Sequence, residues 1–316
     1  MTSSSTNFFE FYFQWAVVVI GVVGTAANAL VIYALVASKQ HKKHLLIVNQ
    51  NVLDLFSSFF LMLTYSLKLC KLNLGGPLGY WLCMMLLSEN LVYYGITGSI
   101  VNLAIVTIDR YLKVVHHIWS KKWLFPWVIY SAMAFAWLAS IVYNTTVVFA
   151  TSGVIDGVCY AIVLSKSNVD RLAYTCFGVT SHYVIILVIF IFCYGRILIT
   201  VRRQTRVMAG HGDAGSGTVE NHLNQLQTNV IKTMVLVSAF YAIAWLPINV
   251  YYIYFAANPN ATFLDGRYYA SMFLSFFYTC TNPFIYVMNF DPVNKVLRNM
   301  ISCKKTPDQH VVAIGT

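Results

Sequence analysis

Charged side chains are scarce in this sequence, since only 10% of its 316 residues are Asp, Glu, Lys or Arg. Soluble domains carry about 25% charge, so this composition, with 58% hydrophobic residues, indicates a chain that lies in a bilayer. The patterns of soluble enzymes are missing as well: there is no HExxH, no P-loop, no GxSxG and no glycine-rich dinucleotide loop. The adjacent His116 and His117 would diverge on a helix and would not chelate one metal ion. We therefore do not expect an enzyme.

Seven apolar stretches are each long enough to cross a bilayer, which takes about 20 residues of helix. Backbone groups in lipid must be satisfied within their own segment, so helices are the plausible form of these stretches. The sequence predicts an all-α fold, a seven-transmembrane helix bundle. The expected spans are residues 12–37, 45–70, 82–114, 124–149, 171–201, 228–256 and 268–289.

Lys and Arg are distributed unequally between the two sets of connections. One set holds Lys39, Lys42, Lys43, Lys113, Lys121, Lys122, Arg202, Arg203, Arg206, Lys304 and Lys305, and the other holds only Lys68, Lys71, Lys166, Arg171 and Arg267. The positive-inside rule therefore places the N-terminus outside the cell and the C-terminus in the cytoplasm. The net charge of +10 comes from these juxtamembrane clusters and gives no separate support for a nucleic-acid partner.

Four segments follow from this pattern. Residues 1–11 form a short extracellular N-terminus, and we expect no cleavable signal peptide, because the first apolar run lacks a basic n-region. Residues 12–290 form the transmembrane domain, with a mobile Gly/Ser linker at 211–217. Residues 291–301 alternate polar and apolar groups at helical spacing, which predicts an amphipathic helix on the inner lipid surface. Residues 302–316 are a cytoplasmic tail.

The seven cysteines are too dispersed for a disulfide scaffold. Cys83 and Cys159 both fall on the predicted outer side, where oxidising conditions favour a disulfide, and Cys70 is the alternative partner. Three others lie inside spans and are expected to be buried free thiols: Cys176, Cys193 and Cys280.

Three further positions are candidates for modification. Cys303 follows the amphipathic stretch at the cytoplasmic face and is a candidate for palmitoylation. Two Asn-x-Thr sequons occur. Asn260 lies in an outer loop and is usable for glycosylation, whereas Asn144 is too close to the membrane.

A series of polar residues, one or two per span, interrupts the apolar pattern: Asn28, Asp54, Ser99, Asp109-Arg110, Trp245-Leu246-Pro247 and Asn282-Pro283-Phe284-Ile285-Tyr286. In this order the series resembles that of the rhodopsin-like (class A) G-protein-coupled receptors, over about residues 12–301. The resemblance implies a plasma-membrane receptor that passes an activating signal to a heterotrimeric G protein. Among G proteins we favour a Gi-type partner.

The resemblance also implies roles at the inner end. Asp109, Arg110 and Tyr111 match the family's Asp-Arg-Tyr triplet, in which the carboxylate holds the guanidinium at rest and the guanidinium reaches the G protein on opening. Ile118, in the second inner loop, is expected to be a secondary apolar anchor on the G protein. Tyr194 matches the tyrosine of span five that meets span seven on activation.

Further inside the bundle, Asp54, Ser99, Asn28 and Asn282 resemble the family's sodium pocket, so a sodium ion at Asp54 is an expected, though not a required, cofactor. Trp245 and Pro247 resemble the pivot of span six, because proline removes a helical hydrogen bond. Asn282, Pro283 and Tyr286 resemble the hinge of span seven. Trp137 matches the family's span-four tryptophan, with a packing role. Cys83 and Cys159 match the cysteines that tie the second outer loop to span three.

Several positions depart from the family pattern. Ile186 replaces a proline of span five, Tyr241 a Phe and Ala244 a Cys of span six, and His117 a proline of the second inner loop. Tyr278 and Thr279 stand where the sodium pocket more often has Asn and Ser. Cys83 and Arg110 are separated by 27 positions, against 25 in most relatives. Gln227 lies where many relatives carry a Glu that pairs with the arginine of span three, so that ionic lock is expected to be absent.

The outer half of the bundle is expected to bind the ligand. Candidate pocket residues are Glu89, Asn90, Tyr93, Tyr94, His182, Trp245, Asn249, Tyr252, Tyr268 and Met272. The amine-binding aspartate position holds Asn90 or Val92, which disfavours a monoamine, and Phe276 replaces the retinal lysine. The ligand itself, a small molecule, a lipid or a short peptide, is not identified. His182 is either a ligand contact or, more often for such a residue, an interhelical hydrogen bonder.

Two other classes were weighed, a seven-helix transporter or ion pump and a light sensor. A pump needs a relay of titratable groups across the bilayer, and none runs outward from Asp54. We further expect activity without added agonist, because Gln227 removes one inactive-state ion pair. Two apolar segments are candidate built-in ligands, residues 160–164 of the outer loop and the aromatic stretch Phe8–Phe13. Ordinary packing at the membrane interface is the alternative for both.

Overall fold

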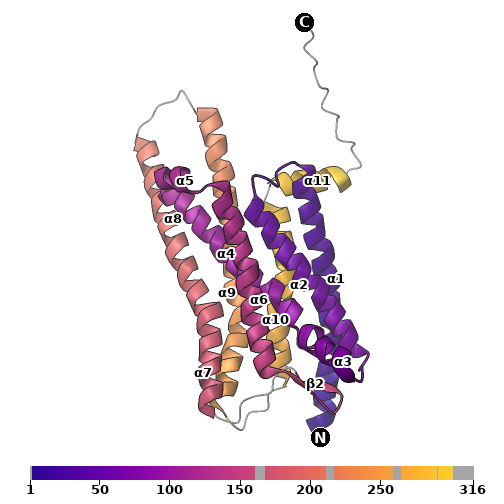
Figure 1. Cartoon of the computed structure of the whole chain (residues 1–316). Helices are drawn as coiled ribbons and strands as arrows, with labels where there is room; N and C mark the ends of the chain where they lie inside the picture. The colour runs from indigo at the N-terminus through magenta and orange to yellow at the C-terminus, as the bar shows by residue number, and fades with distance from the viewer. Residues whose placement is uncertain (1, 161–167, 211–216, 259–264, 290, 302–316) are drawn as a thin grey trace.

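In the computed structural model, which describes residues 2–160, 168–210, 217–258, 265–289 and 291–301, long helices run side by side in one bundle (Figure 1). The helices are α1 (Thr2–Ala37), α2 (Leu45–Leu69), α3 (Gly76–Leu82), α4 (Asn90–Val115), α5 (His117–Trp123), α6 (Pro126–Thr151), α7 (Asn168–Val179), α8 (Ile185–Gly210), α9 (Gly217–Ala257), α10 (Gly266–Asn289) and α11 (Asp291–Ile301). The predicted all-α bundle is therefore confirmed.

Six stretches of the described chain are long and apolar enough to cross a membrane. They lie in α1, α2, α3 to α4, α6, α7 to α8, and α9. The seventh span is α10, which packs against α1 and α9. α10 is less apolar in composition than its neighbours because it contains polar residues, among them Ser275, Thr279 and Asn282. These polar residues are buried within the bundle.

Two spans contain π-helical turns, which insert an extra residue into a helix. In span three the turn η1 (Cys83–Leu87) follows α3, and the chain then breaks at Ser88 and Glu89 before α4 begins. Glu89 has a φ of 63°, a left-handed conformation that is uncommon outside glycine. Both irregularities lie between Cys83 and Arg110, in the segment that was expected from the sequence to be two residues longer than in most relatives.

In span five the turn η2 (Thr180–Val184) joins α7 to α8. The sequence left the geometry of this region open, because Ile186 replaces the family's proline. The structure shows that the helix widens here without a proline.

A small hairpin covers the outer end of span three. Strands β1 (Gly153–Ile155) and β2 (Val158–Tyr160) pair antiparallel, with Ile155 opposite Val158. The two-residue loop Asp156-Gly157 has positive φ at both positions, as such hairpin turns require. Cys159 of β2 forms the disulfide with Cys83, with Cα atoms 5.4 Å apart. The predicted pairing is confirmed, and Cys70 is an exposed free thiol.

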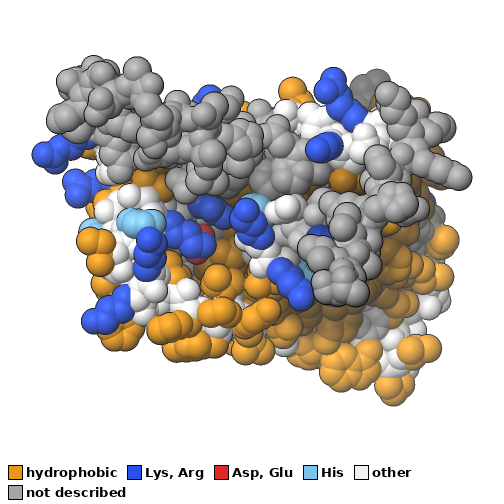
Figure 2. All heavy atoms as spheres, turned by 90° about the horizontal axis from the view of Figure 1, so that it is seen from above, with side chains coloured by type: hydrophobic (Ala, Val, Ile, Leu, Met, Phe, Trp, Pro, Cys, Tyr) orange, Lys and Arg blue, Asp and Glu red, His pale blue; other side chains and the backbone are white. Residues whose placement is uncertain are grey.

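The opposite end of the bundle carries α5 and α11. α1 ends at Ala37, followed by Lys39 in the left-handed conformation that commonly closes helices. α11 lies across the ends of α1 and α10, with Val293 and Leu297 buried beneath it. Lys and Arg side chains gather on this end (Figure 2). Asn260 and Cys303, the modification candidates, lie outside the described residues.

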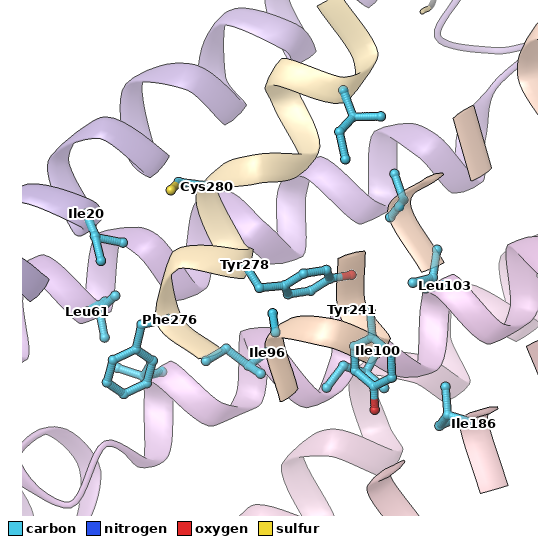
Figure 3. Close-up of a cluster of buried hydrophobic side chains, with 14 of the residues drawn as sticks. Ile20, Leu61, Ile96, Ile100, Leu103, Ile186, Tyr241, Phe276, Tyr278 and Cys280 are labelled. Carbon is cyan, nitrogen blue, oxygen red and sulfur yellow. The ribbon is translucent and has the colours of Figure 1, made fainter. Parts of the chain in front are cut away.

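Buried aromatic and aliphatic side chains from several spans meet in the middle of the bundle. Tyr241 and Tyr278 lie near Ile96, Ile100 and Leu103, and Phe276 lies beside Leu61 (Figure 3). Two expectations need correction. Cys176 is exposed rather than buried, because α7 turns it away from the neighbouring helices, whereas Cys193 and Cys280 are buried as expected.

The second correction concerns the N-terminal stretch. α1 begins at Thr2, so residues 2–11 continue the first helix. Phe8, Phe9, Phe11 and Tyr12 are exposed on it, and only Phe13 packs inward, against Tyr65, Tyr269 and Phe276. The structure therefore contradicts the idea that the whole stretch folds over the opening. Of the other candidate built-in ligand, residues 160–164, only Tyr160 lies in the described part, exposed at the end of β2.

Candidate functional site

The end of α4 that was predicted to face the cytoplasm, called the inner end below, carries the Asp-Arg-Tyr triplet. Asp109 is 4% exposed and forms an ion pair with Lys113, one helical turn later, at 2.8 Å. Arg110 Nε lies farther from the same carboxylate, at 3.7 Å, and has no hydrogen-bond partner among the described residues. The carboxylate expected to hold Arg110 is thus engaged mainly by Lys113. Lys113 was not expected to be the partner of Asp109, although its i,i+4 spacing from Asp109 is that of helical ion pairs.

The surroundings of the triplet are basic. Burial, the nearby Arg110 guanidinium and the Lys43 and Lys113 ammonium groups together lower the pKa of His44 to about 4. Tyr111 turns away from Arg110, since its hydroxyl lies 3.1 Å from His116 Nε2 and its ring packs on Phe192. The Asp109 carboxylate does not fully neutralise the Arg110 guanidinium. That cationic group is therefore open to an anionic or electron-rich partner surface.

Two further residues of the inner end were expected to contact or sense the G protein. Ile118, on α5, is 86% exposed and presents an apolar side chain beyond the bundle. Gln227 lies on α9, in a stretch for which only the backbone is described. The expected absence of an ionic lock at this position therefore stays a prediction.

Tyr194 joins three spans. Its hydroxyl lies 2.9 Å from Thr107 Oγ1 on α4 and 3.1 Å from Ser238 Oγ on α9. Thr107 and Ser238 were not singled out from the sequence, because one hydroxyl in an apolar span indicates no particular partner. The bonds place Tyr194 where a movement of α9 would change its contacts.

The centre of the bundle holds the residues expected for a sodium pocket. Asp54 Oδ2 accepts a hydrogen bond from Asn282 Nδ2 at 2.7 Å. Asn28 Nδ2 donates to the main-chain carbonyl of Thr279 at 3.2 Å. Pro283 has no N–H to offer that carbonyl four residues earlier, so Asn28 occupies the vacancy that the proline creates. Asp54, Asn28 and Asn282 are thus brought together as predicted.

Ser99, the remaining sodium-pocket candidate, also joins this site, because its side chain and that of Gln50 both contact the Asp54 carboxylate. Its hydroxyl accepts a hydrogen bond from Gln50 Nε2. Gln50 in turn accepts from Asn102, and Asn102 accepts from Asn49, both at 2.8 Å. Trp137 Nε1 donates to Asn49 at 3.2 Å and so anchors α6 to this network. Trp137 therefore has a hydrogen-bonding role in addition to packing.

This site suits a hard cation. Three buried oxygens, Asn28 Oδ1, Asp54 Oδ1 and Asn282 Oδ1, have no hydrogen-bond partner within the described part of the chain. Buried polar groups normally have one. Carboxylate and amide oxygens are also the donors that hard cations prefer. The residues present therefore fit a sodium ion.

The pivot of span six is tied to span five by two reciprocal hydrogen bonds. The Tyr241 hydroxyl donates to the main-chain carbonyl of His182, inside the π-helical turn η2. The Tyr183 hydroxyl donates back to the carbonyl of Ala242 at 2.7 Å. Two departures from the family pattern therefore meet here: the hydroxyl gained at Tyr241 bonds to the turn that lacks a proline. Trp245 lies one turn further along α9, its ring centroid 6.2 Å from that of Tyr241.

Span seven completes this inner core. Tyr286, of the Asn-Pro-x-x-Tyr sequence, is 1% exposed, and Pro283 lies within α10 without ending the helix. Pro247 likewise lies within α9, and Asn249 Nδ2 donates to the Trp245 carbonyl at 2.7 Å next to it. Trp245 Nε1 has no hydrogen-bond partner among the described residues.

At the outer end the structure brings together five of the ten expected pocket residues, Glu89, Tyr93, Tyr252, Tyr268 and Met272. Glu89 lies within electrostatic range of Tyr93, Tyr252 and Tyr268. Tyr252 also contacts Met272, with its hydroxyl 3.7 Å from the sulfur. Two residues that the sequence did not place in the pocket complete the cluster, Tyr65 and Lys68, both of which bond to Glu89. Tyr65 and Lys68 are polar groups on the apolar helix α2, and nothing in the sequence indicated that they bond to Glu89.

Other pocket candidates lie apart from this cluster. The His182 ring contacts that of Tyr143 on α6, with centroids 4.1 Å apart and planes tilted by 59°. The interhelical hydrogen bond weighed from the sequence for this side chain stays a prediction. Tyr94 bonds to Thr145 on α6. Asn90 is fully buried, and its Nδ2 lies 3.9 Å from the Met85 sulfur. Asn144 donates to the carbonyls of Tyr93 and Ser140, consistent with an unused sequon.

This fold and these sites define a seven-helix membrane receptor with a polar core, an outer aromatic cluster and a basic inner end. The chain matches the family described as 7 transmembrane receptor (rhodopsin family) over residues 27–286. That match covers most of the chain, so the protein belongs to the rhodopsin-like receptor family, as the sequence predicted, and is a multi-pass membrane receptor rather than an enzyme.

Individual relatives agree with this assignment. The chain is 26% identical over 278 residues to Melatonin receptor type 1A of Mus musculus, covering 84% of this chain and 73% of the relative. It is 27% identical over 284 residues to Somatostatin receptor type 3 of Mus musculus, covering 85% and 63%. With Melatonin receptor type 1B of Mus musculus, the match is 25% over 194 residues and spans about half of that relative, 51%.

Proposed function

We propose that this receptor carries an activating signal from the outer face to a heterotrimeric G protein bound at the inner end, with its N-terminus outside the cell. The observation that carries this proposal is the arrangement around Arg110, at the basic end of the bundle beside the exposed Ile118 of α5. A carboxyl-terminal segment of a partner would find both a guanidinium and an apolar anchor there. A Gi-type G protein is the partner we propose.

The test is a cell-based assay of G-protein dissociation, run with one reporter for each major Gα class and without added ligand. We expect the wild-type receptor to dissociate the Gi reporter above the level of mock-transfected cells. Dissociation of another Gα class alone would refute the Gi assignment. No dissociation of any class would refute the basal activity proposed next.

Substantial basal activity is part of the proposal. A two-state receptor rests only if its inactive state is lower in free energy, and about 1.4 kcal/mol of that difference changes the populations tenfold. Lys113 competes for Asp109, and Gln227 offers Arg110 no carboxylate. Gln227→Glu should therefore lower basal signalling, whereas Gln227→Asn, which adds no charge, should leave it near the wild-type level. Equal signalling by the two variants would remove Gln227 from the account.

Sodium is proposed as an ion of the inactive state at Asp54, with Asn28 and Asn282 contributing oxygens. Replacing sodium by potassium at constant ionic strength should lower the melting temperature of the wild-type receptor. Asp54→Asn should abolish that difference. If the variant still responds to sodium, the ion binds elsewhere.

The ligand is proposed to be a small molecule, a lipid or a short peptide that enters the outer aromatic cluster. The relatives' names include both a small molecule, melatonin, and a peptide, somatostatin, so the family match alone does not select one. We also propose glycosylation at Asn260 and palmitoylation at Cys303. Substitution of either residue should remove the modification, which is measured as a change in the mobility of the receptor on gels.

A further inference from the structure

A partly buried ion pair lies within the outer aromatic cluster. Lys68 Nζ, in the last turn of α2, is 2.5 Å from Glu89 Oε1, and the two side chains are 23% and 12% exposed. The Tyr65 hydroxyl donates to the same oxygen at 2.7 Å. The ammonium group also lies 4.5 Å from the centroid of the Tyr65 ring. The Lys68 ammonium is therefore held by a carboxylate and an aromatic face together.

Such a combination is a general means of binding an ammonium group, since both the carboxylate and the π-face attract a cation. Here the carboxylate is fixed by the backbone. Glu89 is the residue before α4, held in the left-handed conformation where span three breaks. Tyr93, Tyr252 and Tyr268, on α4, α9 and α10, lie within electrostatic range of it.

Lys68 and Glu89 differ in how easily their side chains can move out of the aromatic cluster. Lys68 has a flexible four-carbon stem at the end of α2 and is the more exposed partner, so its ammonium group can swing into water. Glu89 has a shorter side chain on a constrained backbone among tyrosines. If the pair opens, the group that remains in the cluster is the carboxylate.

We propose that Glu89 and its surrounding tyrosines are a binding site for a primary ammonium group of the ligand, and that Lys68 occupies this site in the ligand-free receptor. The inference rests on the proposed function in one respect, that the ligand enters from the outer face. A ligand ammonium would then bind by displacing Lys68. This acid lies at neither of the two positions, Asn90 and Val92, that align with the family's amine-binding aspartate.

The first consequence is an asymmetry between two single variants. Lys68→Met leaves a partly buried carboxylate without its cation, which is costly, whereas Glu89→Gln leaves a lysine that can reach water. We therefore expect Lys68→Met to lower surface expression and the melting temperature more than Glu89→Gln does. The double variant Lys68→Met/Glu89→Gln should recover much of the loss, because no unpaired charge remains.

The second consequence is chemical rescue. Purified Lys68→Met receptor in nanodiscs is titrated with ethylammonium chloride, and the melting temperature is recorded against equal concentrations of sodium chloride. We expect ethylammonium to raise the melting temperature of Lys68→Met by several degrees at tens of millimolar. The double variant should not respond. Lys71→Met, which removes an exposed lysine from the same outer connection, serves as the matched control and should behave as wild type.

Each outcome bears on the proposal. Stabilisation of Lys68→Met by sodium propionate instead of ethylammonium would assign the site to an anion and overturn it, as would no response to either. Where Lys68→Met is not recovered folded, surface expression decides: a loss in Glu89→Gln equal to or greater than that in Lys68→Met contradicts the assignment. None of these measurements involves a G protein, so their failure is distinguishable from a failure of the coupling function.

Discussion

Lys113 Nζ lies 2.8 Å from the Asp109 carboxylate, whereas Arg110 Nε lies 3.7 Å from it. Asp109, the residue that would restrain Arg110, thus pairs more closely with Lys113, one helical turn away. Because Asp109 is almost fully buried while Lys113 is partly exposed, the carboxylate cannot easily turn from one partner to the other. This geometry favours a receptor whose Arg110 is available without a ligand.

Lys113→Gln tests that relationship. Removing the ammonium group should leave Asp109 to Arg110 and so stabilise the resting state. An ion pair of this exposure is worth about 0.5–1 kcal/mol, which corresponds to a fall in basal signalling of roughly 2- to 5-fold. The assay is ligand-free G-protein dissociation at matched surface expression. Lys121→Gln, on the exposed part of α5, is the control, and an equal fall in both variants would argue against a specific role for Lys113.

Tyr241→Phe removes one hydroxyl from the tie between α9 and η2. The loss of its hydrogen bond to the His182 carbonyl should destabilise the receptor by about 1 kcal/mol, since the Tyr241 side chain is buried in the bundle. Melting curves in detergent provide the measurement. Tyr12→Phe, a change on the exposed face of α1, should have no effect. Equal melting temperatures for Tyr241→Phe and wild type would show that the bond contributes nothing.

The Cys83–Cys159 disulfide should be required for delivery to the cell surface. It fastens the hairpin of β1 and β2 to η1 and closes a loop of 76 residues, which restricts the unfolded chain. Cys83→Ser and Cys159→Ser should reduce surface expression to similar extents, and the double variant should be no worse than either. Cys70→Ser, at an exposed free thiol, is the control. A severe loss with Cys70→Ser would mean that another pairing operates in cells.

Because the folded receptor disfavours protonation of His44, the stability of the receptor should decrease as the pH falls. The side chain has a pKa of about 4 in the folded receptor against 6.5 in the unfolded chain, so between these values the unfolded state binds more protons. Stability is therefore expected to be constant above about pH 7 and to decrease from there toward pH 4. His44→Gln should flatten that part of the profile, measured as melting temperature against pH. An unchanged profile would show that other groups cause the decrease.

Much of the architecture followed from the sequence, because membrane spans are set by length and apolarity and because Asp54, Asn282 and Pro283 form part of a familiar ordered series. The hydrogen-bond partners of individual side chains were harder to predict, because they depend on how each helix is rotated about its axis. The hydrogen bond from Tyr241 to His182 exists only because η2 shifts the register of span five, and no residue in the sequence marks that shift. The Lys113 ion pair was different in kind, since its i,i+4 spacing could have been read directly.

The polar network of Gln50, Asn102 and Asn49 illustrates the same limit. Each residue is visible in the sequence as a polar group in an apolar span, yet their mutual bonds depend on how α2 and α4 face one another. The expected partnership of Ser99 with Asp54 is present, but the additional bond from Gln50, on the same helix as Asp54, to the serine hydroxyl was not anticipated. These three residues were not singled out from the sequence, and the packing of α2 against α4 determined which of them pair.

The most direct test of the central claim is nucleotide exchange on a purified Gi heterotrimer, catalysed by purified receptor in nanodiscs without ligand. We predict that wild-type receptor accelerates exchange above empty nanodiscs, that Ile118→Asp lowers the rate in part, and that Arg110→Ala reduces it to the level of empty nanodiscs while retaining its melting temperature. Exchange by folded Arg110→Ala at the wild-type rate would contradict the assignment of Arg110 as the group that engages the G protein.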